Sequence, residues 1–310
     1  MATEPAVRAP YELVAQDPRG SAIRDQVRGY WALTKPDVNF LIAVTVLAGF
    51  CLAHPDADKP FPLARLIHAL VGTLLVAGGA GALNQLIEWR FDARMRRTAR
   101  RPLASGQITT LGAGVFGVFL CATGCVDLGW GVNWLTAALA GLTLISYLFV
   151  YTPWKRRNLF CTPVGALAGA FPPLIGWAAA TGRLNAGAWI LYGLIFLWQF
   201  PHFMAIAWIY RHDYERAGYK ILPQGQQRER FVAWMSVLPT LLLIPLTAMP
   251  VLLRSAGPLY LTGAWLLTVG FLTMAAHLVR HKSNAIARRV LLASIVYLPS
   301  VLFLLLMDRR

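Results

Sequence analysis

The sequence predicts an all-α fold, a polytopic integral membrane bundle of about nine transmembrane helices. Its residues are 57% hydrophobic and only 14% charged, and the mean hydropathy is +0.52, which excludes an ordinary water-soluble domain. Apolar runs of roughly 17 to 25 residues recur along the chain, long enough to cross a hydrocarbon layer of ~30 Å. Because the runs are apolar on all sides, they predict helices and not the alternating strands of a membrane barrel.

Nine such runs follow one another with short connections, and the first is the shortest. The double proline of the fifth run and Pro201 of the sixth weaken helical hydrogen bonding, which membrane helices tolerate where they open on a cavity. No connection is long enough for a soluble domain, so we expect a polar cytoplasmic tail over 1–37 and one transmembrane domain over 38–310. The runs are 38–53, 64–87, 111–129, 132–151, 162–180, 187–209, 231–253, 258–279 and 289–306.

The positive charges are divided unequally between the two ends of the predicted helices. The formal net charge is +15, and 23 of the 29 lysines and arginines lie before the first run or after the second, fourth, sixth and eighth. This asymmetry is typical of membrane topology, so it favours that explanation over nucleic-acid binding and predicts a cytoplasmic N-terminus and a periplasmic C-terminus. The first 37 residues contain acidic groups and no apolar signal core, which favours a bacterial inner (plasma) membrane.

A polar stripe interrupts the second apolar run in "NQLIEWRFDARMRRTARRPL", residues 84–103. Asn84, Glu88 and Asp92 are spaced by four residues and therefore share one face of a helix. Solvation of a helix end would explain one acidic residue. Three polar groups in register at the edge of a membrane are costly enough to indicate a functional site.

The chemistry of this stretch suggests a metal-bridged diphosphate. Carboxylate and amide oxygens suit Mg²⁺, which usually completes its coordination with water and substrate phosphate. A positive-inside loop would account for the neighbouring arginines but not for the acidic stripe. The arginines that match phosphate geometry are Arg94, Arg96, Arg97, Arg100 and Arg101.

A second polar cluster follows the sixth run in "WQFPHFMAIAWIYRHDYERAGYKILP", residues 198–223, on the same predicted side. Asp213 and Glu215 are candidate ligands of a second metal, although a solvated loop explains them about equally well. "YTPWKRRN", residues 151–158, ends the fourth run at that side too. It places Lys155, Arg156 and Arg157 on that face. The candidate phosphate-binding residues of the second cluster are Arg211, Arg216 and Lys220.

His202 lies within the sixth apolar run, beside Pro201. The proline removes a backbone donor and frees a carbonyl, which predicts a local polar notch in the helix. A histidine there is either a hydrogen-bonded core residue or an axial ligand of haem iron. Both interpretations remain open from the sequence.

Together these segments resemble the protohaem IX farnesyltransferases (haem O synthases) of the UbiA-type intramembrane prenyltransferase superfamily. The resemblance covers about residues 30 to 300. The N-x-x-x-E-x-x-x-D series marks the superfamily, whereas the M-x-R-T-x-x-R-P-L series and "PHF" are more specific. Glu88 occupies a position at which many members have Asp. In the second signature Asp213 is the one firmly placed acid, whereas other members have two aspartates. Further similar segments are "LTKPDV", "GQI", "YTPWKRR" and "GALAGAFPPLIGW".

The resemblance implies a UbiA-type prenyltransferase fold and a Mg²⁺-dependent transferase. The family transfers the farnesyl group of farnesyl diphosphate to a vinyl group of haem B, and the product haem O serves haem-copper terminal oxidases. Haem B is then a substrate and not a resident cofactor. The lipid bilayer is an implied partner, as is a haem A synthase or an oxidase assembly factor; nucleic acid is not.

The resemblance also implies a role for particular residues. Mg²⁺ on the diphosphate would be held by the three residues of the stripe together with Asp213. His202 would ligate the haem iron. The leaving diphosphate would be neutralised by Arg97, Arg101, Lys155 and Arg211, and the allylic cation would be shielded by Tyr151, Trp198 and Tyr210.

Two other functions share some of these features. A UbiA-type prenyltransferase acting on an aromatic quinone precursor would need the same acidic and basic stripes but not His202. A transporter or ion-coupled carrier would also use intramembrane acids and broken helices, but near the middle of the bilayer. The position of the stripe at one membrane edge favours an enzyme.

Overall fold

The computed structural model describes residues 18–54 and 60–310, so part of the predicted N-terminal tail lies outside the described residues. Within them the regular structure is helical except for one isolated bridge between Ala256 and Arg309, which confirms the predicted all-α fold. The elements are α1(Pro18–Leu33), α2(Pro36–Ala53), α3(Leu63–Asp92), α4(Thr110–Gly131), α5(Trp134–Ile145), η1(Ser146–Tyr151), α6(Thr152–Trp154), α7(Cys161–Gly169), α8(Phe171–Thr181), α9(Ala186–Ile209), α10(Arg211–Arg216), α11(Gln227–Leu252), α12(Pro258–His281) and α13(Asn284–Met307).

Nine segments of the described chain are long and apolar enough to cross a membrane, as the sequence predicts. The fourth span combines α5, η1 and α6, and the fifth combines α7 and α8. The second span differs most at its end, because α3 continues to Asp92 whereas the apolar run ends at residue 87. The polar stripe is therefore helical throughout.

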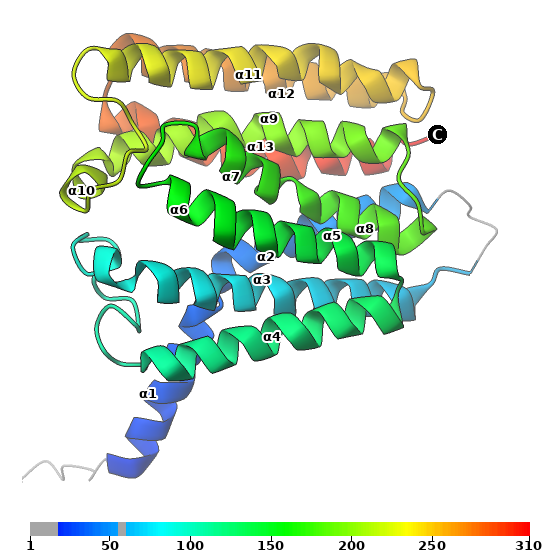
Figure 1. Ribbon diagram of the computed structural model, residues 1–310. Helices are drawn as coiled ribbons and strands as arrows, with labels where there is room; N and C mark the ends of the chain where they lie inside the picture. Colours follow the sequence, from blue (N-terminus) through cyan, green and yellow to red (C-terminus); the bar gives the residue numbers. More distant parts are fainter. Residues whose placement is uncertain (1–17, 55–59) are drawn as a thin grey trace, which may run out of the picture.

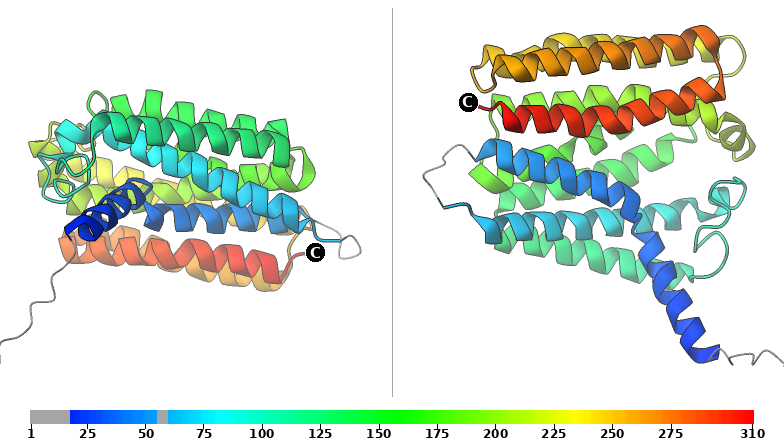
Figure 2. Two further views of the ribbon diagram at one scale, coloured as in Figure 1. Left: turned by 90° about the horizontal axis from the view of Figure 1, so that it is seen from below. Right: turned by 180° about the vertical axis from the view of Figure 1, so that it is seen from behind.

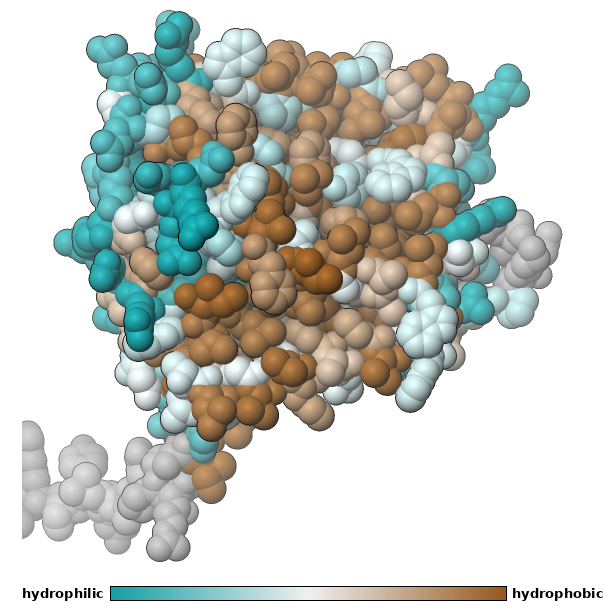
Figure 3. All heavy atoms as spheres, in the orientation of Figure 1, coloured by the Kyte–Doolittle hydropathy of each residue, from teal (hydrophilic) through white to brown (hydrophobic). Residues whose placement is uncertain are grey.

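The long helices run side by side, with their ends gathered at two opposite faces of the bundle (Figure 1). Helix α2 lies between α3 and α13, whereas α1 leaves the bundle at an angle (Figure 2). Figure 3 shows hydrophobic residues across the middle and hydrophilic residues at both ends, more densely at the end that carries α10 and the connection after α3. This distribution is that of a multi-pass integral membrane protein.

Glycines bring α2 and α8 into close contact. A Cβ atom at Gly176 would lie 2.0 Å from the carbonyl oxygen of Val46, and one at Gly49 would lie 2.3 Å from that of Pro173. Small residues permit such approach between membrane helices, where packing replaces the hydrophobic effect as the main attraction. The contact fixes α2 against the centre of the bundle.

The prolines act differently in the two predicted interruptions. Residues 161–181 form two helices that meet at Ala170, and Pro172 and Pro173 occupy the first turn of α8, where a missing N–H is tolerated. Helix α9 instead continues through Pro201. The proline at 201 therefore does not break its helix.

Candidate active site

A polar cavity of about 90 Å³ lies at the hydrophilic end of the bundle, where α3 approaches η1, α6 and the segment after α10. One water occupies roughly 30 Å³ of liquid, so the cavity as described holds only a few waters. Its walls are Lys35, Asn84, Glu88, Asp92, Met95, Arg97, Arg101, Tyr147, Tyr151, Lys155, Tyr214, Tyr219 and Ile221.

The polar stripe of α3 forms one wall of this cavity. Asn84, Glu88 and Asp92 are all buried, and Asn84 Nδ2 donates to Glu88 Oε2 at 3.0 Å. Asn84 also donates to Thr152 Oγ1 at 3.2 Å, which joins α3 to α6. The spacing of four residues has placed the three side chains on the same face of the helix.

Each polar group of the stripe accepts a hydrogen bond from a cation of another segment. Lys35 Nζ donates to Asn84 Oδ1 at 2.8 Å, Lys155 Nζ lies 3.1 Å from both oxygens of Glu88, and Arg101 Nη1 donates to Asp92 Oδ2 at 2.8 Å. The three cations come from three different segments of the chain. Pairing is what makes buried carboxylates tolerable in the fold.

Lys35 was assigned no role from the sequence, although it belongs to the quoted segment "LTKPDV". It precedes α2 with a left-handed φ of 55°, a conformation that non-glycine residues adopt mainly where the surroundings hold them. Burial lowers the pKa of Lys35, and the positive charges of Arg101 and Lys155 act in the same direction. Its position directly before the first apolar run was the feature of the sequence that could have indicated a role for Lys35.

Lys155 and Tyr151 enter the cavity from the end of the fourth span. Burial alone would lower the pKa of Lys155, but the charge of Glu88 outweighs it and the pKa lies well above its ordinary value. The Lys155 ammonium also lies 4.5 Å from the centre of the Tyr151 ring. The π-helical segment η1 widens the turn here, as such segments often do at functional sites, and Tyr147 faces the cavity along with Tyr151.

Arg97 joins the cavity to the segment around α10. Its guanidinium lies 4.9 Å from the centre of the Tyr210 ring and donates to the Tyr214 hydroxyl at 3.5 Å. Tyr210 itself is not among the residues that line the cavity. Tyr210 is linked to the cavity through its contact with Arg97.

Asp213 and Arg211 also lie outside the cavity lining. Asp213 pairs with Arg216 at 3.5 Å within α10. Arg211 Nη1 donates to the carbonyl of Trp208 and to Asn284 Oδ1, both at 2.7 Å. In the described conformation Asp213 bonds within α10, and Arg211 bonds to α9 and α13.

His202 and Trp198 lie deeper in α9 and away from the polar cavity. Their rings stack with centroids 5.0 Å apart. His202 Nδ1 lies 2.8 Å from Ser294 Oγ, and Trp198 Nε1 donates to the Ser294 carbonyl at 2.8 Å. Within the described part of the chain the hydrogen bond of His202 is made through Nδ1, which leaves Nε2 as the ring nitrogen available to a ligand.

Three tyrosines line the cavity although the sequence did not predict a role for them. Tyr147 and Tyr214 line it together with Tyr219, whose side chain is only 7% exposed. Burial, and then the charges of Glu88 and Asp92, raises the pKa of Tyr219 far above its ordinary value, despite an opposing effect of Lys155. The spacing of these tyrosines did not indicate a shared site, because Tyr147 belongs to a different segment from Tyr214 and Tyr219.

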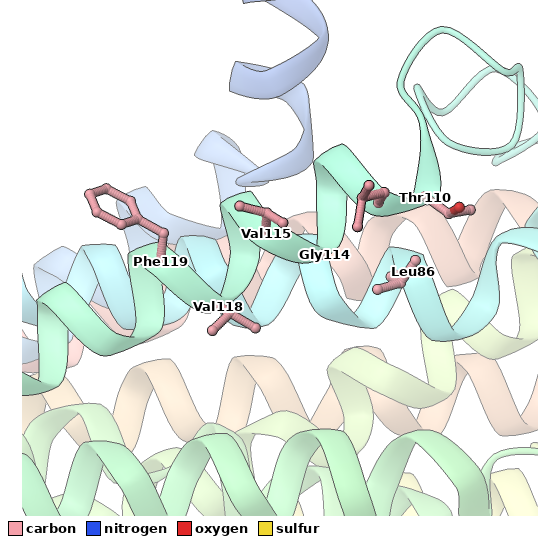
Figure 4. A pocket seen from close by; sticks show the side chains of 7 residues that line it. Leu86, Thr110, Gly114, Val115, Val118 and Phe119 are labelled. Carbon is pink, nitrogen blue, oxygen red and sulfur yellow. The ribbon is translucent and has the colours of Figure 1, made fainter.

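A second hollow lies on the outer flank of the bundle, between α3 and α4 (Figure 4). It measures about 740 Å³ and is lined mainly by apolar side chains such as Leu86, Val115 and Phe119. Val115 and Phe119 are exposed on this flank. In a membrane this face meets lipid tails, and none of its lining residues carries a charge.

Known proteins are similar to this chain over about nine-tenths of its length. The model of the UbiA prenyltransferase family matches residues 42–300. A protein of Solibacter usitatus named Protoheme IX farnesyltransferase is 44% identical over 91% of this chain and 99% of its own length. A protein of the same name from Koribacter versatilis is 41% identical over 91% of this chain and 94% of its own length.

Solved structures share the fold at much lower sequence identity. A structure described as digeranylgeranylglyceryl phosphate synthase has a TM-score of 0.72 and 17% identity, covering 91% of this chain and 98% of that chain. A UbiA homolog from Archaeoglobus fulgidus bound to GPP and Mg²⁺ has a TM-score of 0.65 and 13% identity, covering 90% of this chain and 99% of that chain. These likenesses confirm the predicted membrane bundle.

Proposed function

The chain belongs to the UbiA prenyltransferase family, and from this premise we propose that it acts as a protohaem IX farnesyltransferase. It transfers the farnesyl group of farnesyl diphosphate to a vinyl group of haem B, and the product is haem O. The relatives that share 41–44% of its residues over nine-tenths of the chain carry that name. The family model spans every residue that lines the polar cavity except Lys35.

The observation that carries the proposal is the pairing of the α3 stripe with cations around one cavity. A metal diphosphate brings both positive and negative charge into such a site. The metal would take over oxygens of Glu88 and Asp92, and the released Lys155 and Arg101 would turn to the phosphate oxygens. Because the cavity measures only about 90 Å³, substrate binding must separate these pairs and open it.

The oxygen donors of the cavity fit Mg²⁺. Asp92 Oδ1 is buried and makes no hydrogen bond to a described residue, so it is free to coordinate an ion. Among the described residues no three His, Cys, Asp or Glu side chains converge on one point. The remaining ligands would therefore be Asn84, water and the diphosphate, which is the usual behaviour of Mg²⁺. Asp213 stays a candidate that substrate would draw in from α10.

The bound ion would act as a Lewis acid and would hold the diphosphate in place. The C–O bond of farnesyl diphosphate breaks with its electron pair passing to the diphosphate, whose charge Lys155, Arg101 and Arg97 neutralise. Arg211 would have to leave its contacts with α13 to join them. Lys155 is suited to this role because its charge persists across the physiological pH range.

The allylic cation that remains needs electron-rich faces and exclusion of water. Tyr151 is in the cavity wall, and we assign Tyr210 and Trp198 to the surrounding shield. The haem vinyl group forms a bond to the cation, and water then adds to the resulting cationic carbon with loss of a proton. His202 would present the haem by ligating its iron through Nε2.

We further propose that the protein lies in a bacterial inner membrane with its N-terminus in the cytoplasm. The basic residues gather at the end of the bundle that holds the polar cavity, and the C-terminus lies at the other end (Figure 1). Positive charges favour the cytoplasmic face. Farnesyl diphosphate would then enter from the cytoplasm.

Incubation of the purified protein with Mg²⁺, farnesyl diphosphate and haem B tests the function. Mass spectrometry should find a pigment heavier than haem B by one farnesyl group and one hydroxyl group. A family member specific for an aromatic quinone precursor would leave haem B unchanged and prenylate the aromatic compound. Release of diphosphate that depends on haem B distinguishes the two.

A further inference from the structure

Tyr219 has a buried hydroxyl without a partner. The residue is 7% exposed and lines the polar cavity, yet its hydroxyl makes no hydrogen bond of normal geometry to a residue that the structure describes. The carboxylate of Glu88 lies near enough to raise the pKa of Tyr219, but it is held by Lys155 and Asn84. Buried polar groups are nearly always hydrogen-bonded, because leaving one unpaired is destabilising. Other buried atoms of the described residues are also unpaired, but the Tyr219 hydroxyl is one that belongs to the wall of the polar cavity, where a ligand could bond to it.

The backbone and the ring hold Tyr219 in this position. Gly218 turns the chain with a φ of 78°, and the Tyr219 N–H donates to the Tyr214 carbonyl at 2.9 Å. The next N–H, that of Lys220, donates to the carbonyl of Lys155 at 2.8 Å. The ring packs edge-on against Phe91 at 6.1 Å between centroids. These contacts fix the ring beside the cavity.

A second unpaired atom faces the same cavity. Asp92 Oδ1 is also buried, and it bonds neither to the Tyr219 hydroxyl nor to another described residue. A ligand that satisfies both must offer positive charge to the carboxylate and an oxygen acceptor to the hydroxyl. A magnesium-bound diphosphate offers both.

We propose that Tyr219 is a substrate-binding residue whose hydroxyl donates a hydrogen bond to a diphosphate oxygen. The proposal rests on the proposed function, because it takes the polar cavity as the site of the diphosphate. A phenol keeps its proton at neutral pH and is thus a donor there. Its role differs from that of Lys155 and Arg101, since it adds a directed hydrogen bond without adding charge.

The test compares Tyr219→Phe with Tyr260→Phe. Tyr260 on α12 is fully buried, and its hydroxyl likewise has no described partner, so the control removes the same atom far from the cavity. The probe is inorganic diphosphate with Mg²⁺, measured by its competition with farnesyl diphosphate. Tyr219→Phe should weaken its binding about tenfold and raise the KM for farnesyl diphosphate similarly, as expected for a hydrogen bond to a charged group.

The KM for haem B should stay unchanged in both variants, and Tyr260→Phe should bind the probe like the wild type. Phenylalanine keeps the ring contacts of tyrosine. Titration with haem B measures the concentration of binding-competent protein in each sample. Wild-type affinity for the probe in Tyr219→Phe would overturn the proposal, as would equal weakening by both variants. Failure of the proposed function looks different, because the wild type itself would then make no farnesylated haem.

Discussion

Lys155 Nζ lies 3.1 Å from both carboxylate oxygens of Glu88, across 67 positions of the chain. The side chains are 14% and 5% exposed, so the pair is largely removed from water. It joins the end of the fourth span to α3 at the wall of the polar cavity. Both the stability of the fold and the chemistry of the site therefore depend on this pair.

Lys155→Met should lower the free energy of unfolding by about 3 kcal/mol or more, because it leaves the charge of Glu88 buried without its main partner. Thermal unfolding in detergent measures the loss. Adding Glu88→Gln should restore much of the stability but none of the activity. Lys282→Met is the control, since Lys282 pairs with Glu229 at an exposed site where a pair contributes roughly 0–1 kcal/mol. Equal losses in the two single variants would contradict the prediction.

Asp92→Asn should reduce farnesyl transfer roughly 100-fold or more while the protein stays folded, because a metal ion contributes several kcal/mol of transition-state stabilisation. Turnover assays and the elution profile in detergent provide the measurement. Asp127→Asn is the matched control, because Asp127 pairs with His68 and does not line the cavity. Excess chelator should also stop the wild type. Full turnover with chelator present would remove the metal from the mechanism.

His202→Ala should weaken haem binding and change the absorption spectrum of the bound haem, because an axial nitrogen is lost from the iron. Binding of magnesium diphosphate should remain near that of the wild type. His277→Ala, on the exposed part of α12, should leave the spectrum unaltered. If well-folded His202→Ala protein keeps both its haem affinity and its spectrum, the histidine only bonds Ser294 and is not part of the haem site.

The polar cavity should face the cytoplasm, and the C-terminus should face the periplasm. An alkaline phosphatase fused after Arg310 should be active, because that enzyme matures only outside the cytoplasm, whereas a fluorescent protein that folds only in the cytoplasm should stay dark there. A fusion in the loop around Gly225 should give the opposite pattern. Reversed activities at the two positions would show that the orientation is inverted.

The sequence by itself determined the membrane class, the number of spans and the register of the α3 stripe. Each of these is a local property: a run of apolar residues has a length, and a spacing of four residues on one helix has a fixed direction. The predicted spans agree with the nine of the described chain, and the stripe of Asn84, Glu88 and Asp92 lines one cavity.

Only the tertiary structure decided which groups meet that stripe. Lys35 reaches Asn84 across 49 positions and Lys155 reaches Glu88 across 67, and such contacts depend on how separate helices pack. The same packing brings Tyr219 to the cavity and leaves Asp213 paired within α10. Charge and spacing along the chain do not encode these choices, because the direction of a side chain in a loop is set by the neighbours against which the loop folds.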